Sequence, residues 1–173
     1  KDSPFFLYLA HPQPHVPLFA SSKFNGRSKS GLYTDVIEEI DNSVGMIMKA
    51  IRNNDLEKNT IVVFTSDNGP WLSYGKHSGS TGIYREGKGT TWEGGQRVPC
   101  IVWFPKDIKA NSVISTPLMG IDWVPTFASV TKAKLSKNKI DGKNIWSTLT
   151  QESEEDPHEA LFFYYHLNSL HGV

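Results

Sequence analysis

Two residues that suit a hard metal ion stand side by side in the middle of the chain. Asp67 and Asn68 follow the apolar run at residues 61–64 and precede Gly69 and Pro70, which are typical turn residues. A carboxylate and an amide oxygen are ligands that Ca²⁺ and Mg²⁺ accept. The same pair also occurs in ordinary turns, where both side chains bond only to nearby backbone. The spacing alone leaves a metal site and a plain turn open.

Two histidines lie on a stiff segment near the N-terminus. His11 and His15 alternate with Pro12, Pro14 and Pro17. Proline fixes its own φ and keeps the preceding residue out of a helix, so the segment is predicted to be extended and rigid. A general acid must be held in place, which favours a catalytic role. A rigid surface loop with solvated histidines is the alternative.

A glycine-dense stretch at residues 75–95 holds seven of the fourteen glycines and carries Lys88. Irregular loops of this length are usually functional or disordered. Residues 82–89 nearly match a phosphate-binding P-loop, but Gly89 stands where a hydroxyl residue should follow the lysine. A nucleotide site is therefore not predicted. By itself, Lys88 fits a solvated surface charge as well as a site residue.

The elements that must position these residues alternate between strands and helices. The apolar runs at residues 5–9 and 61–64 are typical of strands buried on both faces. Apolar residues recur with helical spacing across residues 31–52, which predicts an amphipathic helix. Strand, helix and strand give a βαβ unit with a right-handed crossover. Asp67 and Asn68 would then lie at the carboxyl end of a strand, where open α/β sheets bind ligands.

The second half of the chain is predicted to hold a strand, a helix and a last strand, at residues 101–104, 119–130 and 160–165. Cys100 is the single cysteine, so an intrachain disulfide is excluded. Its place at the start of an apolar strand predicts a buried, inert thiol.

Composition excludes several classes of function. The chain has 173 residues, 18 basic and 18 acidic residues and a formal net charge of zero. This balance argues against binding to nucleic acid or to a membrane surface by bulk charge. No apolar run approaches the roughly 20 residues of a membrane-spanning helix. The length suits one domain with a real core.

Taken in order, the motifs resemble the sulfatase family of the alkaline-phosphatase-like superfamily, and the resemblance covers nearly the whole chain. It rests on residues 11–17, 33–45 (YTDVIEEIDNSVG), 65–69, 87–99 and 120–126, and on the strand after residues 157–159. It implies an α/β fold with a mixed, mostly parallel sheet sandwiched by helices. Residues 1–135 would form the C-terminal part of the catalytic domain. Residues 136–173 would form a linker and the start of a smaller C-terminal antiparallel sheet.

The resemblance also implies a chemistry, the hydrolysis of sulfate esters by a formylglycine nucleophile and one divalent cation, Ca²⁺ or alternatively Mg²⁺. Asp67 and Asn68 match metal ligands of the family. His15 matches the histidine that contacts the sulfate and protonates the leaving oxygen, and Lys88 matches the lysine that bridges the sulfate and the leaving group. His77 is a further candidate for substrate binding.

A specificity loop is expected at residues 71–86. Trp71, Tyr74 and His77 could line a site for a sugar or an aryl group there, and a disordered surface loop is the alternative. The expected partner is a sulfated small molecule or a sulfated sugar, with no nucleic acid and no membrane span. The family resemblance implies a periplasmic, secreted or lysosomal parent protein.

The chain departs from the family pattern at the nucleophile. The family's Cys/Ser-x-Pro-x-Arg motif is absent, and the surroundings of Cys100 do not match it. The family's paired acidic ligands and second lysine–histidine pair are also missing. We therefore expect an incomplete domain that begins inside a sulfatase catalytic domain and is inactive alone. A phosphodiesterase or phosphonate hydrolase of the same superfamily, or a degenerate relative acting as a binding module, are the alternatives.

Overall fold

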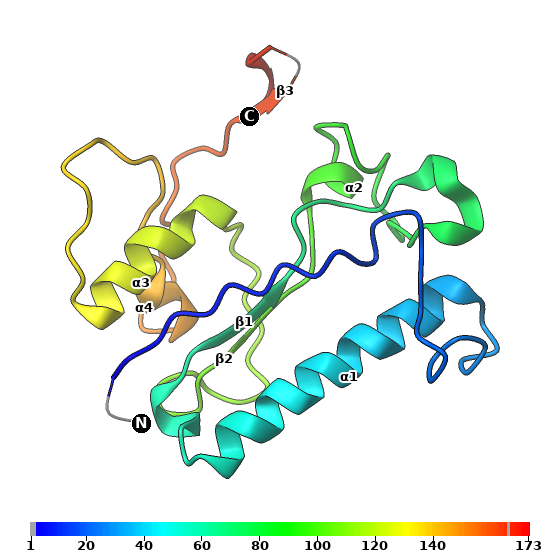
Figure 1. Cartoon of the computed structure of the whole chain (residues 1–173). Coiled ribbons are helices and arrows are strands. Elements are labelled where there is room, and N and C mark those ends of the chain that lie inside the picture. The colour runs from blue at the N-terminus through cyan, green and yellow to red at the C-terminus, as the bar shows by residue number, and fades with distance from the viewer. Residues whose placement is uncertain (1–2, 166) are drawn as a thin grey trace. The chain divides into compact units, whose positions relative to one another are not determined.

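The computed structural model describes residues 3–165 and 167–173 (Figure 1). The chain divides into two compact units. Unit 1 comprises Lys1–Leu56 and Thr65–Pro99, and unit 2 comprises Glu57–Phe64 and Cys100–Val173. All of the site residues predicted from the sequence fall in unit 1, namely His15, Asp67, Asn68, His77 and Lys88. The boundary predicted at residue 135 separates part of a catalytic domain from a smaller C-terminal subdomain, and the division into two compact units does not test it. This boundary stays a prediction.

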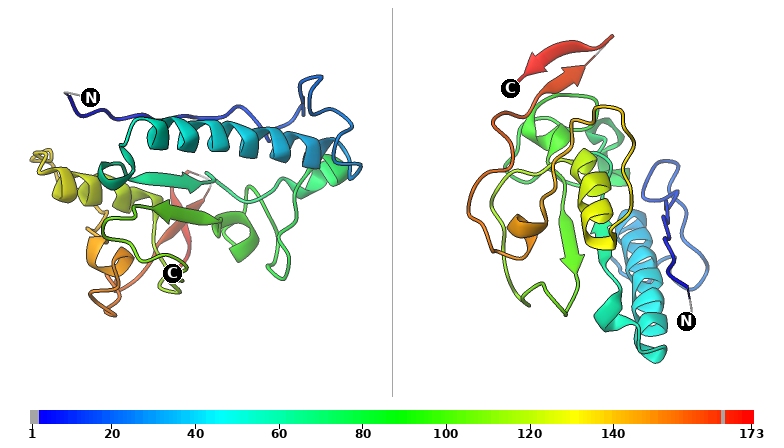
Figure 2. Two further views of the ribbon diagram at one scale, coloured as in Figure 1. Left: turned by 90° about the horizontal axis from the view of Figure 1, so that it is seen from below. Right: turned by 90° about the vertical axis from the view of Figure 1, so that its left-hand side faces the viewer.

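Unit 1 is built on the long helix α1, Leu32–Asn53, which both views of Figure 2 show as continuous. The helix agrees with the one predicted at residues 31–52. Its buried face carries Val36 and Ile40, which pack on the preceding segment in a cluster with Leu18, Ala20 and Phe24. Neither this helix nor any other in the described part of the chain has the length and apolar character to cross a membrane.

Two carboxylates of α1 fasten the turns that precede it. The Asp35 carboxylate accepts hydrogen bonds from the backbone N–H groups of Ser28 and Gly26, both at 2.8 Å. Glu39 Oε2 accepts the N–H of Ser21 at 2.8 Å. Hydrogen bonds from Ser28, and then from Gly26, hold the pKa of Asp35 below its ordinary value, and those from Ser21 lower the pKa of Glu39. Both side chains are thus most stabilising when ionised.

The rest of unit 1 is mostly irregular, as the glycine content predicts. It contains the short 3-10 helix η2, Leu72–His77, and one turn of α-helix, α2, Glu93–Gln96. Between them, residues 78–92 form turns and bends with no regular element.

The prediction of a buried strand at residues 5–9 is wrong for this structure. The segment forms no strand, and its side chains are exposed, from 52% for Leu9 to 82% for Tyr8. An apolar run becomes a buried strand only where other strands pair with it and helices cover it. Among the described residues no strand pairs with this segment.

A small sheet consists of two neighbouring strands, β1, Val62–Thr65, and β2, Cys100–Trp103. All of its residues except Thr65 belong to unit 2. Thr65 Oγ1, at the end of β1, donates to the carbonyl of Pro99, which precedes β2, at 3.1 Å. The end of one strand therefore meets the start of the other, so the pair is antiparallel. The described residues do not form the predicted parallel βαβ unit, because the segment before α1 is not a strand.

Burial in this sheet is also lower than predicted. Val62 and Val63 are half-buried, whereas Phe64 and Thr65 are exposed. Cys100 is exposed as well, so the prediction of a buried thiol is wrong. Two strands cannot cover both of their own faces, which explains why residues with a strong apolar pattern remain accessible.

The remainder of unit 2 holds the predicted helix and the predicted C-terminal strand. The 3-10 turn η3, Gly120–Asp122, leads into α3, Trp123–Thr131, and the single turn α4, Trp146–Leu149, follows. The strands β3, Phe163–Tyr165, and β4, Ser169–Gly172, pair antiparallel, with Phe163 opposite Gly172 (Figure 2). This pair matches the expected start of a small antiparallel sheet.

Candidate functional site

Glycines bring the loop that carries Lys88 against the turn that follows β1. The N–H of Lys88 donates to the carbonyl of Pro70 at 2.9 Å, and the N–H of Gly69 donates to the carbonyl of Gly95 at 3.0 Å. A Cβ on Gly87 would lie 2.5 Å from the oxygen of Pro70, and a Cβ on Gly69 would overlap backbone atoms of α2. Glycine is required here because two stretches of backbone touch.

The Asp67–Asn68 turn presents oxygen atoms to solvent. Asp67 is exposed, and Asn68 is half-buried. The Asn68 amide nitrogen donates to the carbonyl of Gly69 at 3.1 Å, and Ser66 Oγ donates to the carbonyl of Asn68 at 3.0 Å. Since a carbonyl only accepts hydrogen bonds, the nitrogen of the Asn68 side chain must face Gly69. Its Oδ1 is thereby turned the other way, where it can serve as a ligand.

His15 has a defined orientation although it is exposed. Its Nδ1 lies 2.7 Å from the carbonyl oxygen of Val16. A carbonyl cannot donate, so the Nδ1 atom carries a proton and donates it. In the neutral ring Nε2 is then the atom that can take up a proton, and in the charged ring it is the atom that can give one away.

Trp71 connects the two residues that the sequence proposes for catalysis. The ring centroids of His15 and Trp71 are 5.9 Å apart in an edge arrangement, and Lys88 Nζ lies 5.3 Å from the Trp71 ring centroid. Tyr74 packs on the same ring, with centroids 4.7 Å apart. His15 and Lys88, which are far apart in the sequence, therefore share one aromatic wall.

The structure does not bring every predicted site residue into this group. His77 is exposed at the end of η2, and Asp67 is exposed at the turn. In the part of the chain that the structure describes, neither residue makes a ring contact or ion pair with His15, Trp71 or Lys88. The substrate role of His77 stays a prediction.

The residues of this chain fit part of a metal site. Asp67 and Asn68 offer oxygen donors of the kind that Ca²⁺ prefers, but a Ca²⁺ ion takes about 6–8 oxygen ligands. Across residues 3–165 and 167–173 no three residues of the types His, Cys, Asp and Glu gather as a metal-binding group. Asp67 and Asn68 therefore supply only part of the ligand set that a Ca²⁺ ion needs.

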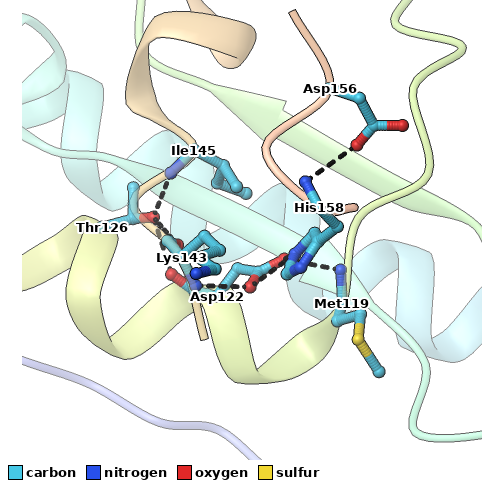
Figure 3. A network of polar contacts seen from close by, with 7 residues as sticks. All are labelled: Met119, Asp122, Thr126, Lys143, Ile145, Asp156 and His158. Atoms are coloured by element: carbon cyan, nitrogen blue, oxygen red, sulfur yellow. Dashed lines mark hydrogen bonds and ion pairs between the residues drawn. The ribbon is translucent and has the colours of Figure 1, made fainter. Parts of the chain in front are cut away.

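A second polar cluster, in unit 2, was not predicted from the sequence (Figure 3). Asp122 is completely buried, and its carboxylate accepts the N–H of Met119 at 2.8 Å and the N–H of Lys143 at 2.9 Å. His158 Nε2 lies 2.9 Å from Asp122 Oδ2, and the His158 side chain is only 6% exposed. Since a carboxylate accepts, the Nε2 atom carries the proton. The cluster ties η3, at the start of α3, to the segment before β3.

Thr126 extends this cluster along α3. Its hydroxyl donates to the carbonyl of Asp122 at 2.6 Å and accepts the N–H of Ile145 at 3.0 Å. The sequence pattern predicts that Asp122 lies near the start of a helix. It does not identify the partner of Asp122, His158, which lies 36 residues away. The usable signal was the pair of motifs at residues 120–126 and 157–159, which the resemblance already contains.

Comparison with known proteins identifies the family. The family model described as Sulfatase matches residues 1–133. The chain is 40% identical to the steryl-sulfatase of Homo sapiens over 169 residues, which is 94% of this chain and 29% of that protein. It is 41% identical to the N-acetylgalactosamine-6-sulfatase of Rattus norvegicus over 175 residues, which is 100% of this chain and 33% of that protein. The chain thus spans about a third of the length of these curated relatives.

A solved structure agrees with the sequence comparison. The crystal structure of Ps i-CgsB in complex with k-i-k-neocarrahexaose superposes with a TM-score of 0.82 at 37% identity, over 95% of this chain and 37% of that chain. The family match covers most of the chain, and the fold agrees over nearly all of it. The chain therefore belongs to the sulfatase family.

Proposed function

We propose that the protein that carries this chain hydrolyses sulfate esters, and that this chain supplies a sulfate-binding cation and a proton donor. The observation that carries the proposal is the shared contact of His15 and Lys88 with the ring of Trp71. The Lys88 backbone is bonded to Pro70, which closes the turn begun by Asp67 and Asn68. Candidate anion, proton and metal groups thus lie on neighbouring segments of unit 1.

Lys88 stabilises negative charge. Its ammonium can approach a sulfuryl oxygen, and such a preformed charge is most effective where charge develops in the transition state. A Ca²⁺ ion bound with the help of Asp67 and Asn68 would add Lewis-acid stabilisation of the same oxygens. The ammonium and the Asp67–Asn68 oxygens are complementary, because one attracts the anion and the others attract the cation.

His15 delivers the proton. The bond from Nδ1 to the carbonyl of Val16 fixes the ring so that Nε2 is the reacting nitrogen. A histidine changes charge near neutral pH, so Nε2 can protonate the leaving oxygen as the ester bond breaks. No Cys/Ser-x-Pro-x-Arg motif occurs in this chain, and we propose that a formylglycine nucleophile comes from a segment outside it.

We propose a sulfated sugar or another sulfated small molecule as the substrate. A relative is named N-acetylgalactosamine-6-sulfatase, and one similar structure holds a neocarrahexaose. By family resemblance the protein would work in the periplasm, in the lysosome or after secretion. The matched proteins named above are sulfatases, which gives no support to the phosphodiesterase, phosphonate hydrolase or binding-module alternatives.

The proposal is tested on the intact protein with a sulfate ester and a phosphodiester of the same nitrophenol. We expect hydrolysis of the sulfate ester, and we expect Lys88→Ala to reduce kcat/KM for it about 10²–10³-fold, as loss of one charge-stabilising donor does elsewhere. Lys49→Ala serves as a matched control, because Lys49 is an exposed lysine of the same unit, on helix α1. Hydrolysis of the phosphodiester in preference to the sulfate ester would refute the proposal.

A further inference from the structure

Trp71 contacts both of the side chains to which the proposed chemistry is assigned. It meets the ring of His15 at 5.9 Å and the ammonium of Lys88 at 5.3 Å, and Tyr74 packs on it at 4.7 Å. The indole is still 41% exposed. One accessible ring therefore forms a wall common to the proposed acid and the proposed anion-binding cation.

The two groups need such a wall because both are positively charged in the state that binds and protonates a sulfate ester. Like charges that converge on one anion repel each other before the anion arrives. Within the described residues neither His15 nor Lys88 forms an ion pair with a carboxylate. The face of an indole is negative and attracts an ammonium within about 6 Å of its centroid. Trp71 thus offsets repulsion without neutralising either charge.

The anchors of the two residues differ. His15 is also held by its Nδ1 bond to Val16. Among the residues that the structure describes, the ammonium of Lys88 has the Trp71 ring as its partner and forms no hydrogen bond or ion pair, while its backbone is bonded to Pro70. Without the ring, the flexible stem of Lys88 would have no fixed direction.

We propose that Trp71 is a positioning residue for sulfate ester hydrolysis. Its ring holds the Lys88 ammonium and orients His15, so that His15 Nε2 and Lys88 Nζ can both contact the same sulfate group. Tyr74 packs against the same ring and supports it. This inference rests on the proposed function, and Trp71 acts in it through His15 and Lys88.

The test compares three variants of the intact protein. Trp71→Leu removes the aromatic ring, and Trp71→Phe keeps a smaller one. Trp92→Leu is the matched control, because Trp92 is 49% exposed in the same unit and carries Arg85 at 3.8 Å from its ring centroid. We expect Trp71→Leu to lower kcat/KM on a sugar sulfate about 10- to 100-fold, since misplacement by 1 Å can cost about 10²-fold. Trp71→Phe should restore much of the loss, and Trp92→Leu should retain activity.

A double-mutant cycle separates positioning from packing. If Trp71 acts through the two charged residues, Trp71→Leu should cost less activity in the His15→Ala background and in the Lys88→Ala background than it costs in the wild type. Independent action would instead multiply the losses. Fully multiplicative losses in both pairs would overturn the proposal, as would equal activity of Trp71→Leu and Trp92→Leu.

A readout that does not depend on turnover is tryptophan fluorescence. A protonated imidazole quenches an indole that it touches, so acidification should dim one component of the emission. That component should be missing in Trp71→Phe and in His15→Gln and present in Trp92→Leu. Its presence in His15→Gln would overturn the proposed contact.

An inactive wild-type protein would overturn the proposed function and this proposal with it. An active wild type whose Trp71→Leu variant is unimpaired would overturn only the role of Trp71.

Discussion

His15 and His158, two of the six histidines of this chain, use the same side chain in opposite ways. His15, in unit 1, is exposed. Its Nδ1 donates to a backbone carbonyl, and its ring contacts the accessible ring of Trp71. His158, in unit 2, is buried and directs Nε2 at the carboxylate of Asp122. The nitrogen that could serve a substrate is accessible in the first case and engaged in the second. Burial and the choice of bonded nitrogen, more than residue type, decide whether a histidine nitrogen stays available to a substrate.

The largest effect is expected when His15 and His158 are substituted separately, as His15→Ala and His158→Gln. General acid catalysis is typically worth about 10²–10⁴-fold, so His15→Ala should lose most of that factor in kcat/KM on a sugar sulfate. It should lose much less on nitrophenyl sulfate, whose leaving group needs no proton. Assays of both substrates in both variants measure the difference.

His158→Gln is the counterpart in the other environment. It should lower stability but leave the ratio of the two substrates' kcat/KM values as in wild type. Equal losses on both substrates for His15→Ala would make His15 a sulfate-binding residue and not the acid.

The second effect concerns the buried cluster itself. Asp122→Ala removes the acceptor of Met119, Lys143 and His158 and leaves these donors buried without it. Loss of one partner of a buried pair typically costs about 3–5 kcal/mol. Urea unfolding of the intact protein measures this, with Asp141→Ala, an exposed aspartate of the same unit, as control. Equal midpoints for the two variants would show that the cluster contributes little.

A smaller effect tests the glycine packing behind Lys88. Gly87→Ala places a Cβ against Pro70 and the Leu72 side chain, and overpacking of this kind costs about 1–3 kcal/mol. Activity should fall too, because Lys88 would shift. Gly45→Ala is the control, since a Cβ there meets nothing within 4 Å and the site is in the middle of α1. An alanine at residue 87 that left both stability and activity intact would exclude the close backbone approach.

The smallest effect should appear as a pH dependence of unit 1. Asp35 and Glu39 have pKa values below their ordinary ones, because the side chain and backbone N–H of Ser28 bond to the ionised Asp35, and the backbone N–H and side chain of Ser21 bond to the ionised Glu39. Their stabilisation is fully present above the unfolded-state pKa of about 4 and is lost as the pH falls through the lower folded values. Thermal unfolding followed from pH 6 down to pH 2 should show this loss. Asp35→Asn should flatten the curve, and an unchanged slope in that variant would contradict the assignment.

The sequence predicted the parts of the fold that depend on local pattern. Helix α1 follows from apolar spacing and from an acid in its first turn with a base in its last, all within one stretch. The run at residues 5–9 shows the limit of such reasoning. Its apolar composition indicates that it is suited to burial. Burial also requires partner strands, however, and a local pattern carries no information about them.

For the candidate site, too, local motifs predicted the residues but not the contacts between them. Local motifs were enough to nominate His15, Lys88, Asp67 and Asn68, with the family resemblance giving them roles. The sequence could not show that His15 and Lys88 meet at Trp71, because that contact depends on how glycine-rich backbone packs. The partner of Asp122 was missed for a related reason, since a pair 36 residues apart leaves no periodic signal.

The exposed segment at residues 5–9 has a consequence for the behaviour of the chain in solution. It reads Phe-Phe-Leu-Tyr-Leu, its side chains are exposed, and it carries no charge. Exposed, uncharged, β-prone segments of this length promote self-association into cross-β assemblies. In this conformation the chain should therefore be prone to aggregate from its N-terminal end, and a single lysine at the centre, Leu7→Lys, should act as a gatekeeper that keeps it in solution.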